Sequence, residues 1–483
     1  MVELVDAPDS KSGGSNALRV RVSLRPPVDD KFMKLKKYTG KNYSNFKESK
    51  SNIFYPKNSR DLISLISYAK KKKLKILSIG SSLSWYDTIF NTKNIIVSLS
   101  KYKKTFQFNK ISGVITVSSF YKINKILSLV NKFQWTIRSI PGNSEVTIGG
   151  CVGNDVHGKD SFKNGNFGAS IIELEIILAN KKKIICSKNK NINIFKAAVG
   201  GLGLIGIITK VKLKLKRVEK NYITYNYVCK NYKEIIKEIY KTNNYEYIYG
   251  WIDMCSQQNE IGRGVIFKSK SVENSGTEIA PNRFFSSIKN LVKSMIFAFC
   301  IKKNLIKQLN YFFYKSFLFK RKNFVSSYKQ VCYPLEDNGV DFKSLISPAS
   351  FLEIQVIIKK NHLKNKLKKL IEKCHKLKLY SCITGIKIHK KNDNYLSFGD
   401  DGISINITKS FNFKNKKKIF KKFELLHKYI IENKHKTYLA KDFFLNKKTF
   451  SKNYVSSNKF MKVKKEIDPT DLFYSDFLRR IKK

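Results

Sequence analysis

The sequence has few acidic residues for its size. Among 483 residues, 36 are Asp or Glu and 94 are Lys or Arg, so the formal net charge is +58. Such an excess indicates an anionic partner, either nucleic acid or a membrane surface. Arginine, the preferred residue for bidentate recognition of phosphates and bases, is a small minority of the cations. Lysine is also spread along the whole chain with Ile and Asn. We therefore expect no nucleic-acid partner, and we interpret the charge as compositional drift with some attraction to an anionic membrane surface.

The eight cysteines lack C-x-x-C spacing, and no histidine cluster accompanies them. Their scatter argues against a zinc site or a disulfide framework and favours a reducing compartment. No uncharged apolar run approaches the ~20 residues that a membrane-spanning helix needs. The N-terminus is acidic and polar, unlike a secretory signal. The sequence thus predicts no metal site and a cytoplasmic protein that does not cross a membrane by helices.

Glycine is sparse too, with 24 residues, but it gathers between Val146 and Gly168, in a run that includes GGCVGNDVHGKD. Glycine allows positive φ or the close approach of a bound group. Successive free N–H groups in a turn form a concavity that suits phosphate oxygens. The β-forming residues between the glycines predict an ordered, partly buried loop. A tight turn would explain two or three glycines but not the polar Asp155, His157 and Lys159 among them. We therefore expect a cofactor or substrate phosphate here.

Two further stretches resemble phosphate turns. A predicted strand over 75–79 runs into a turn of small residues over 80–87, which is a second candidate. Gly201, Gly203 and Gly206 match G-x-G-x-x-G, but that fingerprint must follow a strand and open a helix. Here a helix-like segment precedes the glycines, and a strand of period two begins at Ile208. We therefore reject a nicotinamide-dinucleotide site.

Residues 1–27 differ from the rest, with several Arg and a single Lys, and resemble a read-through translation of a tRNA gene. We expect this extension to be foreign and disordered. The segment 281–322 is rich in Phe, Ile, Leu and Lys, which fits either a membrane-surface segment or an ordinary pair of core helices. Elsewhere, alternating strands and helices indicate an α/β or α+β fold. Helices are expected over 60–70, 121–132, 231–241, 363–378 and 416–434, and strands over 75–79, 95–99, 113–117, 171–178, 222–228, 247–252, 351–358, 382–388 and 403–407.

Three separated motifs carry a resemblance to a known family. VTIGGCVGNDVHGKD with NGNFG, then AAVGGLGLIGIITK, then the tail YLAKD with DPTDLFYSDFLRR, resemble FAD-linked oxidoreductases of the vanillyl-alcohol-oxidase type, whose FAD domain is of the PCMH type. The resemblance extends from about residue 50 to the C-terminus. It implies an α+β fold in which 28–216 and 436–483 form a two-part FAD-binding domain. The inserted α+β substrate domain, 217–435, would be an antiparallel sheet flanked by helices.

The resemblance also implies which residues bind FAD. Leu83 stands where relatives with covalent flavin have His, so we expect non-covalent FAD. Ser82 replaces a usual Gly, and Trp85 replaces a Tyr close to the flavin ring. The implied cofactor residues are Gly80, Ser81, Ser82, Leu83, Ser84, Trp85, Pro141, Gly142, Thr147, Gly149, Gly150, Gly153, Asn154, His157, Gly158, Gly203 and Ile208.

Among the residues near the substrate, the resemblance gives catalytic roles to Lys441, as base or alkoxide stabiliser, and to His157. Glu353 stands where relatives have Gln, and Ser404-Ile405-Asn406 stands where they have an Asn-x-Cys sequence. These departures affect the expected sugar more than the expected chemistry. The implied substrate-binding residues are Lys159, Trp251, Glu353, Gln355, Lys387, Ser404, Asn406 and Lys441.

The activity implied is oxidation of a secondary sugar hydroxyl to a keto-sugar. The most similar branch of the family acts on a pentose linked to a polyprenyl phosphate, in the 2′-oxidation step of an epimerisation for cell-envelope glycans. A separate NAD(P)H-dependent short-chain keto-reductase would complete the epimerisation, and the enzyme would sit peripherally at the inner face of the membrane. An aldonolactone or alditol oxidase acting on a soluble sugar is an alternative. A basic nucleic-acid-binding protein without flavin is a more distant one.

Overall fold

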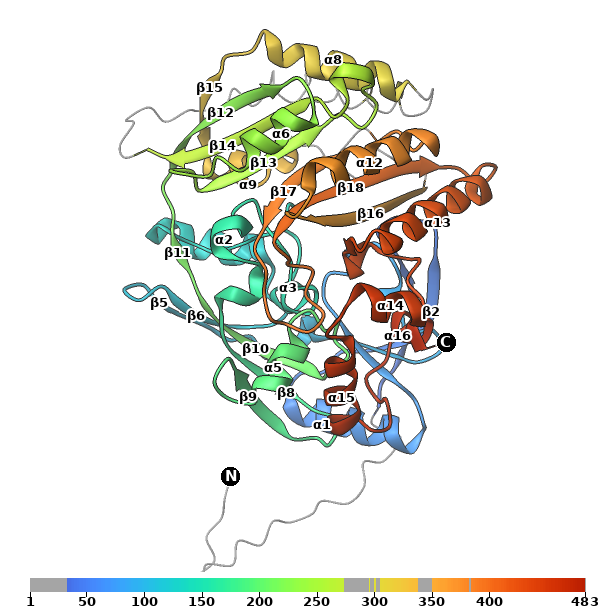
Figure 1. Cartoon of the computed structure of the whole chain (residues 1–483). Coiled ribbons are helices and arrows are strands. Elements are labelled where there is room, and N and C mark those ends of the chain that lie inside the picture. Colours follow the sequence, from blue (N-terminus) through green and yellow to red (C-terminus); the bar gives the residue numbers. More distant parts are fainter. Residues whose placement is uncertain are drawn as a thin grey trace, which may run out of the picture.

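The computed structural model describes residues 33–272, 295, 299–300, 305–337, 350–381 and 384–482. The extension expected over residues 1–27 lies outside the described residues, and so does much of the segment 281–322. In the described part, helices and strands are mixed, which confirms the α+β prediction at that level. Figure 1 shows one large sheet above a group of smaller ones.

The smaller sheets come from the first part of the chain. A four-stranded sheet has the order β1-β2-β4-β3, with β2, β4 and β3 parallel. An antiparallel five-stranded sheet has the order β5-β6-β10-β8-β9, and β7 (Trp135–Thr136) pairs with β11 (Lys216–Arg217). The strand bounds are β1 Lys36–Lys41, β2 Glu48–Phe54, β3 Ile76–Ile79, β4 Ile95–Ser98, β5 Phe106–Asn109, β6 Val114–Ser118, β8 Ile171–Ile177, β9 Lys183–Ser187 and β10 Ile207–Lys214.

The large sheet is antiparallel and has the order β15-β12-β14-β13-β17-β18-β16-β19. Strands β17, β18 and β16 are neighbours in the half of the sheet that ends at β19, and ten consecutive residues of β16 pair with ten of β18. The strand bounds are β12 Asn221–Cys229, β13 Tyr247–Ile252, β14 Gly264–Ser271, β15 Asn323–Ser327, β16 Ser350–Lys359, β17 Gly385–His389, β18 Gly402–Phe411 and β19 Lys436–Thr437. The expected strand 382–388 is thus β17, and its residues 382 and 383 lie outside the described residues.

The helices begin and end where local signals place them. For α1 (Ser59–Lys71), the Asn58 side chain accepts hydrogen bonds from the amides of Arg60 and Asp61, and one apolar stripe is buried. The other helices are α2 Ile123–Val130, α3 Ile148–Asn154, α4 Ser161–Asn164, α5 Ile192–Ala198, α6 Tyr232–Ile239, α8 Ile306–Leu318, α9 Tyr328–Cys332, α10 Pro334–Asp337, α12 Leu363–Lys376, α13 Lys416–Glu432, α14 Lys447–Asn453, α15 Ser457–Ile467 and α16 Asp476–Lys482.

The C-terminal tail returns to the first part of the chain. Leu439, Phe450 and Phe477 share one apolar core with residues of the five-stranded sheet. Phe473 forms a β-bridge with Ile76, the first residue of β3. Figure 1 shows α14, α15 and α16 below the large sheet. Helices α6, α12 and α13 pack on one face of the large sheet. None of the described helices is long and apolar enough to span a membrane.

The glycine-rich stretch corrects one prediction. Residues 148–154, expected to be a loop, form the helix α3, whose first turn is capped by Thr147. The amides of Gly149 and Gly150 bond to Ser119 O and Thr147 Oγ1, so they are not free groups for a phosphate. The glycines around 201–206 do lie between a helix, α5, and a strand, β10, as the rejection of the dinucleotide fingerprint required.

Candidate functional site

Three neighbouring strands of the large sheet, β16, β17 and β18, have one apolar and one polar face. Side chains of successive strand residues point to opposite faces, and β16, β17 and β18 alternate apolar with polar residues almost throughout. The register aligns the three alternations, because Gln355 pairs with Asn406 and Lys387 pairs with Ser404. The apolar face packs against α12 and α13. The polar face consists of Glu353, Gln355, Lys387, His389, Ser404, Asn406 and Thr408.

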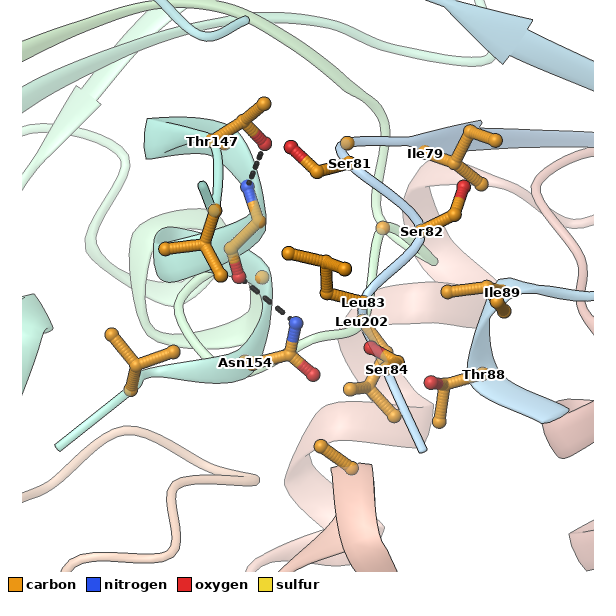
Figure 2. A pocket seen from close by; sticks show the side chains of 18 of the residues that line it. Ile79, Ser81, Ser82, Leu83, Ser84, Thr88, Ile89, Thr147, Asn154 and Leu202 are labelled. Carbon is orange, nitrogen blue, oxygen red and sulfur yellow. Dashed lines mark hydrogen bonds between the residues drawn. The ribbon is translucent and has the colours of Figure 1, made fainter. Parts of the chain in front are cut away.

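A cavity of about 350 Å³ lies beside this face and has the size of a ligand site. The segments that line it include the turn after β3, residues 141–147 with helix α3, the turn before β10, and residues of the tail between 438 and 441. Figure 2 shows Ser81 to Ser84 facing Thr147 and Asn154 across it. We call it the cofactor cavity.

Close backbone approach explains several of the glycines. A Cβ on Gly80 would lie 2.1 Å from Thr147 Oγ1, so a larger residue would separate the turn from α3. Gly149, Gly150 and Gly153 lie on the side of α3 that lines the cofactor cavity, while Ile148, Cys151 and Val152 are buried in the core. Because these glycines have no side chain, the turn can approach α3 closely and the cavity side of the helix stays open.

Ser82 adopts a conformation that favours glycine. Its φ is +57°, the left-handed region, which costs an L-residue roughly 1–2 kcal/mol. This is the position where the family pattern usually has glycine. In the described part of the chain, the amides of Ser82, Leu83 and Ser84 have no acceptor. This turn thus offers the free N–H groups that were expected in the glycine-rich stretch.

A second, polar cavity of about 180 Å³ adjoins the cofactor cavity. Trp85 and Lys441 line both, so the two spaces meet at these side chains. The polar cavity is lined by Trp85, His157, Glu353, Gln355, Gly385, Lys387, Asn406 and Lys441.

Lys441 and Glu353 form an ion pair at this junction. Lys441 Nζ lies 2.6 Å from Glu353 Oε1 and 4.8 Å from the centre of the Trp85 ring. The other carboxylate oxygen accepts a 2.6 Å hydrogen bond from Thr408 Oγ1. The tail residue is therefore held over the polar face of the sheet by a buried carboxylate.

His157 starts a hydrogen-bonded chain across the polar face. Its Nε2 donates to Gln355 Oε1 at 3.3 Å, Gln355 Nε2 donates to Ser404 Oγ at 3.3 Å, and Ser404 Oγ lies 2.7 Å from His389 Nε2. Burial, with the positive charge of Lys387 nearby, lowers the pKa of His157 well below its usual value, so the ring is neutral. Its Nδ1 has no partner in the described chain.

Two further groups share this environment. Burial and the charge of Lys441 lower the pKa of Lys387 to about 8. Burial and the charge of Lys387 lower the pKa of His389 to about 3. Near neutral pH the imidazole of His157 in the polar cavity is therefore neutral and lies near the Lys387 ammonium group.

Asp442 anchors the segment that carries Lys441. Its carboxylate accepts hydrogen bonds from His427 Nε2 at 3.1 Å and from the amides of Phe444 and Leu445. Burial acts to raise the pKa of Asp442, but His427 and Arg480 outweigh it and hold the pKa at about 2. Arg480 of α16 also donates to the carbonyl of Asp442 and pairs with Asp87.

Most of the residues expected near FAD line the cofactor cavity. His157 lies instead in the polar cavity, and Gly158 lines neither, because its amide donates to Ser161 Oγ beside the buried Ser139. The expected residues that line the cofactor cavity are Gly80, Ser81, Ser82, Leu83, Ser84, Trp85, Pro141, Gly142, Thr147, Gly149, Gly150, Gly153, Asn154, Gly203 and Ile208.

The expected substrate residues divide in the same way. Glu353, Gln355, Lys387, Asn406 and Lys441 line the polar cavity, and Ser404 supports Gln355 from behind.

Lys159 and Trp251 line neither cavity. Lys159 Nζ donates to the carbonyl of Val331 and lies 3.9 Å from the centre of the Tyr249 ring. Trp251 packs edge-on against Phe313 of α8.

Several site residues escaped the sequence interpretation. His389 and Thr408 are polar residues within alternating strands, so their period could have revealed them. Two further residues line the cofactor cavity. Tyr438, whose hydroxyl donates to Asn154 O, belongs to the YLAKD motif but is not among the expected site residues, and Thr88 lies just after the turn 80–87, where no sequence pattern marks it.

Comparison with known proteins gives two matching family models. One, described as an FAD binding domain, matches residues 51–187, and one described as D-arabinono-1,4-lactone oxidase matches residues 349–481. The first contains the turn after β3 and α3; the second contains β16, β18 and Lys441.

Individual relatives differ in how much they cover. Decaprenylphosphoryl-beta-D-ribose oxidase of Mycolicibacterium smegmatis is 22% identical over 419 residues, which is 84% of this chain and 89% of that protein. A putative D-arabinono-1,4-lactone oxidase of Neurospora crassa is 26% identical over 159 residues, 33% of this chain and 28% of the relative. Mitochondrial L-galactono-1,4-lactone dehydrogenase of Arabidopsis thaliana is 25% identical over 205 residues, 41% of this chain and 33% of the relative. The chain thus spans about a third of the length of these last two.

The cofactor cavity fits the FAD that these comparisons indicate. Within the described chain, Thr88 Oγ1 and Asn154 Oδ1 are buried at the cavity without a partner. Together with the free amides of the turn 82–84, they are polar groups that a bound ligand would satisfy. The bare face of α3 leaves room for a flat ring system.

A side chain on Gly150 should expel FAD without unfolding the protein. Its Cβ would contact only Thr147 Oγ1, at 3.1 Å, so a longer side chain would enter the cofactor cavity. Leucine is also a better helix former than glycine. We expect Gly150→Leu to lose at least about nine-tenths of its flavin and Gly150→Ala to lose less, measured as absorbance released by acid precipitation. Ser128→Leu, on the exposed side of α2, is the control. Full flavin content in Gly150→Leu would contradict this location of the cofactor.

The Asp442 carboxylate should contribute an acid-dependent part of the stability. Its pKa of about 2 lies below the value of ~3.9 in an unfolded chain, so its contribution is complete above about pH 5 and is lost as pH falls toward 2. The difference corresponds to about 2 kcal/mol. Thermal unfolding followed by circular dichroism should show this loss in the parent chain and in Asp393→Asn, an exposed control, but not in Asp442→Asn. Identical acid profiles for all three would refute it.

Proposed function

We propose that this chain, which belongs to the FAD-dependent oxidoreductases with a PCMH-type FAD-binding domain, oxidises a secondary hydroxyl of a pentose carried on a polyprenyl phosphate. The product would be the 2′-keto-sugar, an intermediate of an epimerisation in cell-envelope synthesis. The observation that carries this proposal is the junction of the polar cavity with the cofactor cavity at Trp85 and Lys441.

The substrate class is supported by coverage and by charge. The relative whose name specifies a decaprenylphosphoryl ribose aligns with most of this chain, whereas the lactone-oxidising relatives align with a part of it. Lys387 and Lys441 give the polar cavity two cations, which suit an anionic phosphate. At about 180 Å³ the cavity suits a sugar and has no room for a polyprenyl chain.

Bound FAD would supply the hydride acceptor, and the protein would orient the sugar. The Lys441 ammonium, fixed by Glu353, would contact the reacting hydroxyl oxygen and stabilise the negative charge that develops there. The lone pair of His157 Nδ1 would accept the hydroxyl proton. Asn406 and Gln355 would bind the other hydroxyls. We assign to FAD binding the expected residues that line the cofactor cavity. The FAD would be bound non-covalently, because Leu83 has no nucleophilic atom.

The domain assignment follows the packing. Residues 28–216 and 436–483 would form the FAD-binding domain, and 217–435 the substrate domain; the shared core of the tail and the five-stranded sheet supports this division. We also propose that a separate keto-reductase consumes the product, and that the protein acts in the cytoplasm at the anionic face of the membrane that holds the lipid.

A second candidate is an aldonolactone or alditol oxidase acting on a soluble sugar. The match to the D-arabinono-1,4-lactone oxidase model favours it, because that match contains Glu353, Gln355, Asn406 and Lys441.

Anaerobic bleaching of the flavin should distinguish the two candidates. We expect a polyprenyl-phospho-pentose in detergent to bleach the flavin absorbance, and free aldonolactones and alditols to leave it unchanged over the same time. The reduced flavin should appear with one equivalent of keto-sugar, which a reductase with NAD(P)H would then consume. Faster bleaching by a lactone would favour the second candidate, and a protein without flavin absorbance would remove both.

Replacing Lys441 should separate cofactor binding from chemistry. We expect Lys441→Ala to keep its flavin but to bleach at least about a hundredfold more slowly, because one transition-state charge partner is lost. Lys441→Arg should recover part of the rate, since Arg keeps the charge but cannot act as a base. Lys448→Ala, at an exposed site on α14, is the matched control. Normal bleaching in Lys441→Ala would contradict the assignment, and equal loss in the Arg variant would identify Lys441 as the base.

A further inference from the structure

Helix α8 (Ile306–Leu318) is held to the large sheet by one side only. Its buried stripe contains Ile306, Asn310, Tyr314 and Phe317. Asn310 Nδ2 donates to Asp253 Oδ1 at 2.8 Å and to Ser381 O at 3.0 Å. These buried hydrogen bonds fix the orientation of the helix, so the side that faces away from the sheet is a defined surface.

That outer side is strongly apolar. Six large apolar side chains of α8 and the residues after it are exposed, and Phe312 and Phe319 reach 68% and 88% exposure. Residues 318–324, with the sequence LFKRKNF, are exposed without interruption. A core helix pair, one of the two readings of this segment, would bury these rings. The exposed apolar residues are Tyr311, Phe312, Phe313, Leu318, Phe319 and Phe324.

The charge around these rings has one sign. Between Glu278 and Glu336 the sequence contains no acidic residue. Lys320, Arg321 and Lys322 are exposed among the aromatic residues, and Lys315 lies 5.5 Å from the centre of the Tyr311 ring. Surfaces that enter the headgroup region of an anionic bilayer typically combine aromatic rings with cations.

Helix α8 lies on the same face of the large sheet as the polar cavity. Phe313 packs 4.8 Å from Trp251, and Trp251 of β13 pairs with Gly385 of β17, which lines that cavity. Gly385 and Lys387 are two residues apart on one strand, so α8 covers the same face of the sheet that carries the polar residues. Figure 1 shows α8 at the end of the molecule opposite α1.

We propose that α8 and residues 319–324, together the α8 surface, dock on a bilayer of anionic phospholipids. The rings enter the headgroup region and the cations pair with lipid phosphates. This docking places the polar cavity near the bilayer, so that a sugar can enter it while its lipid stays in the membrane. That consequence rests on the proposed function; the docking itself depends only on the surface.

Vesicle flotation tests the docking without using activity. The flavin-loaded full chain should float with vesicles of phosphatidylcholine and phosphatidylglycerol, float poorly with phosphatidylcholine alone, and be released by high salt. Replacing Lys320, Arg321 and Lys322 by Gln should lower the partition coefficient about a hundredfold, at about fivefold for each cation. Phe312→Ser with Phe319→Ser should lower it at least about tenfold.

A matched control changes the same residue types on another surface. Phe413→Ser with Lys414→Gln, Lys417→Gln and Lys418→Gln removes one exposed ring and three cations before and within α13. This variant should float like the parent chain. Equal losses in both sets would reduce the effect to net charge and overturn the proposal, as would a parent chain that binds duplex DNA but no vesicle.

The bleaching assay keeps this proposal separate from the proposed function. Variants of the α8 surface should retain full flavin content and should bleach at the parent rate with a short-chain phospho-pentose in solution. If the docking fails and bleaching is normal, only the α8 surface is wrong. If flotation behaves as expected but no polyprenyl-phospho-pentose bleaches the flavin, only the substrate is wrong.

Discussion

The alternation of side chains along β16, β17 and β18 is the constraint on which the site depends. Three short polar series, far apart in the sequence, become one polar surface because the strands pair in a single register. A slip of one residue in any strand would move its polar side chains into the apolar core beneath α12 and α13. Burying Glu353 or Lys387 there without a partner would cost several kcal/mol. The register that completes the core is therefore also the register that forms the site.

The features that local sequence determines could be predicted. The cap at Asn58, the strands of period two and the small-residue turn after β3 all have their signals within a few neighbouring residues, and the structure has α1, β10 and the turn at those places. The glycine-rich stretch marks the right region, but its conformation was predicted wrongly. Glycine lowers helix propensity, yet Thr147 caps the first turn, and the buried Ile148, Cys151 and Val152 give α3 its packing. Tertiary contacts outweigh propensity there.

Other features depend on which strands become neighbours. The pairing of Lys441 with Glu353 requires β19 to follow β16 at the edge of the sheet and the tail to cross the polar face. Lys159 and Trp251 show the reverse. The sequence motifs predicted both residues to lie in the substrate site. In the structure Lys159 donates to the Val331 carbonyl and lies over the Tyr249 ring, and Trp251 packs against α8. The sequence near Lys159 and Trp251 gives no information on where α9 and α8 lie. It therefore could not show that these two side chains lie outside the cavity.

The net charge of +58 shows why composition alone gives so little of the function. A lysine acts according to what desolvates it. Lys387 is half-buried near Lys441, has its pKa lowered to about 8 and lines the polar cavity. Lys441 instead pairs with the Glu353 carboxylate and lies over the Trp85 ring, at the edge of the cofactor cavity. Lys320 and Lys322 are exposed to solvent, among exposed aromatic residues. The same side chain thus occupies three different environments, and the fold, through burial and neighbouring groups, decides which charge interactions each lysine makes.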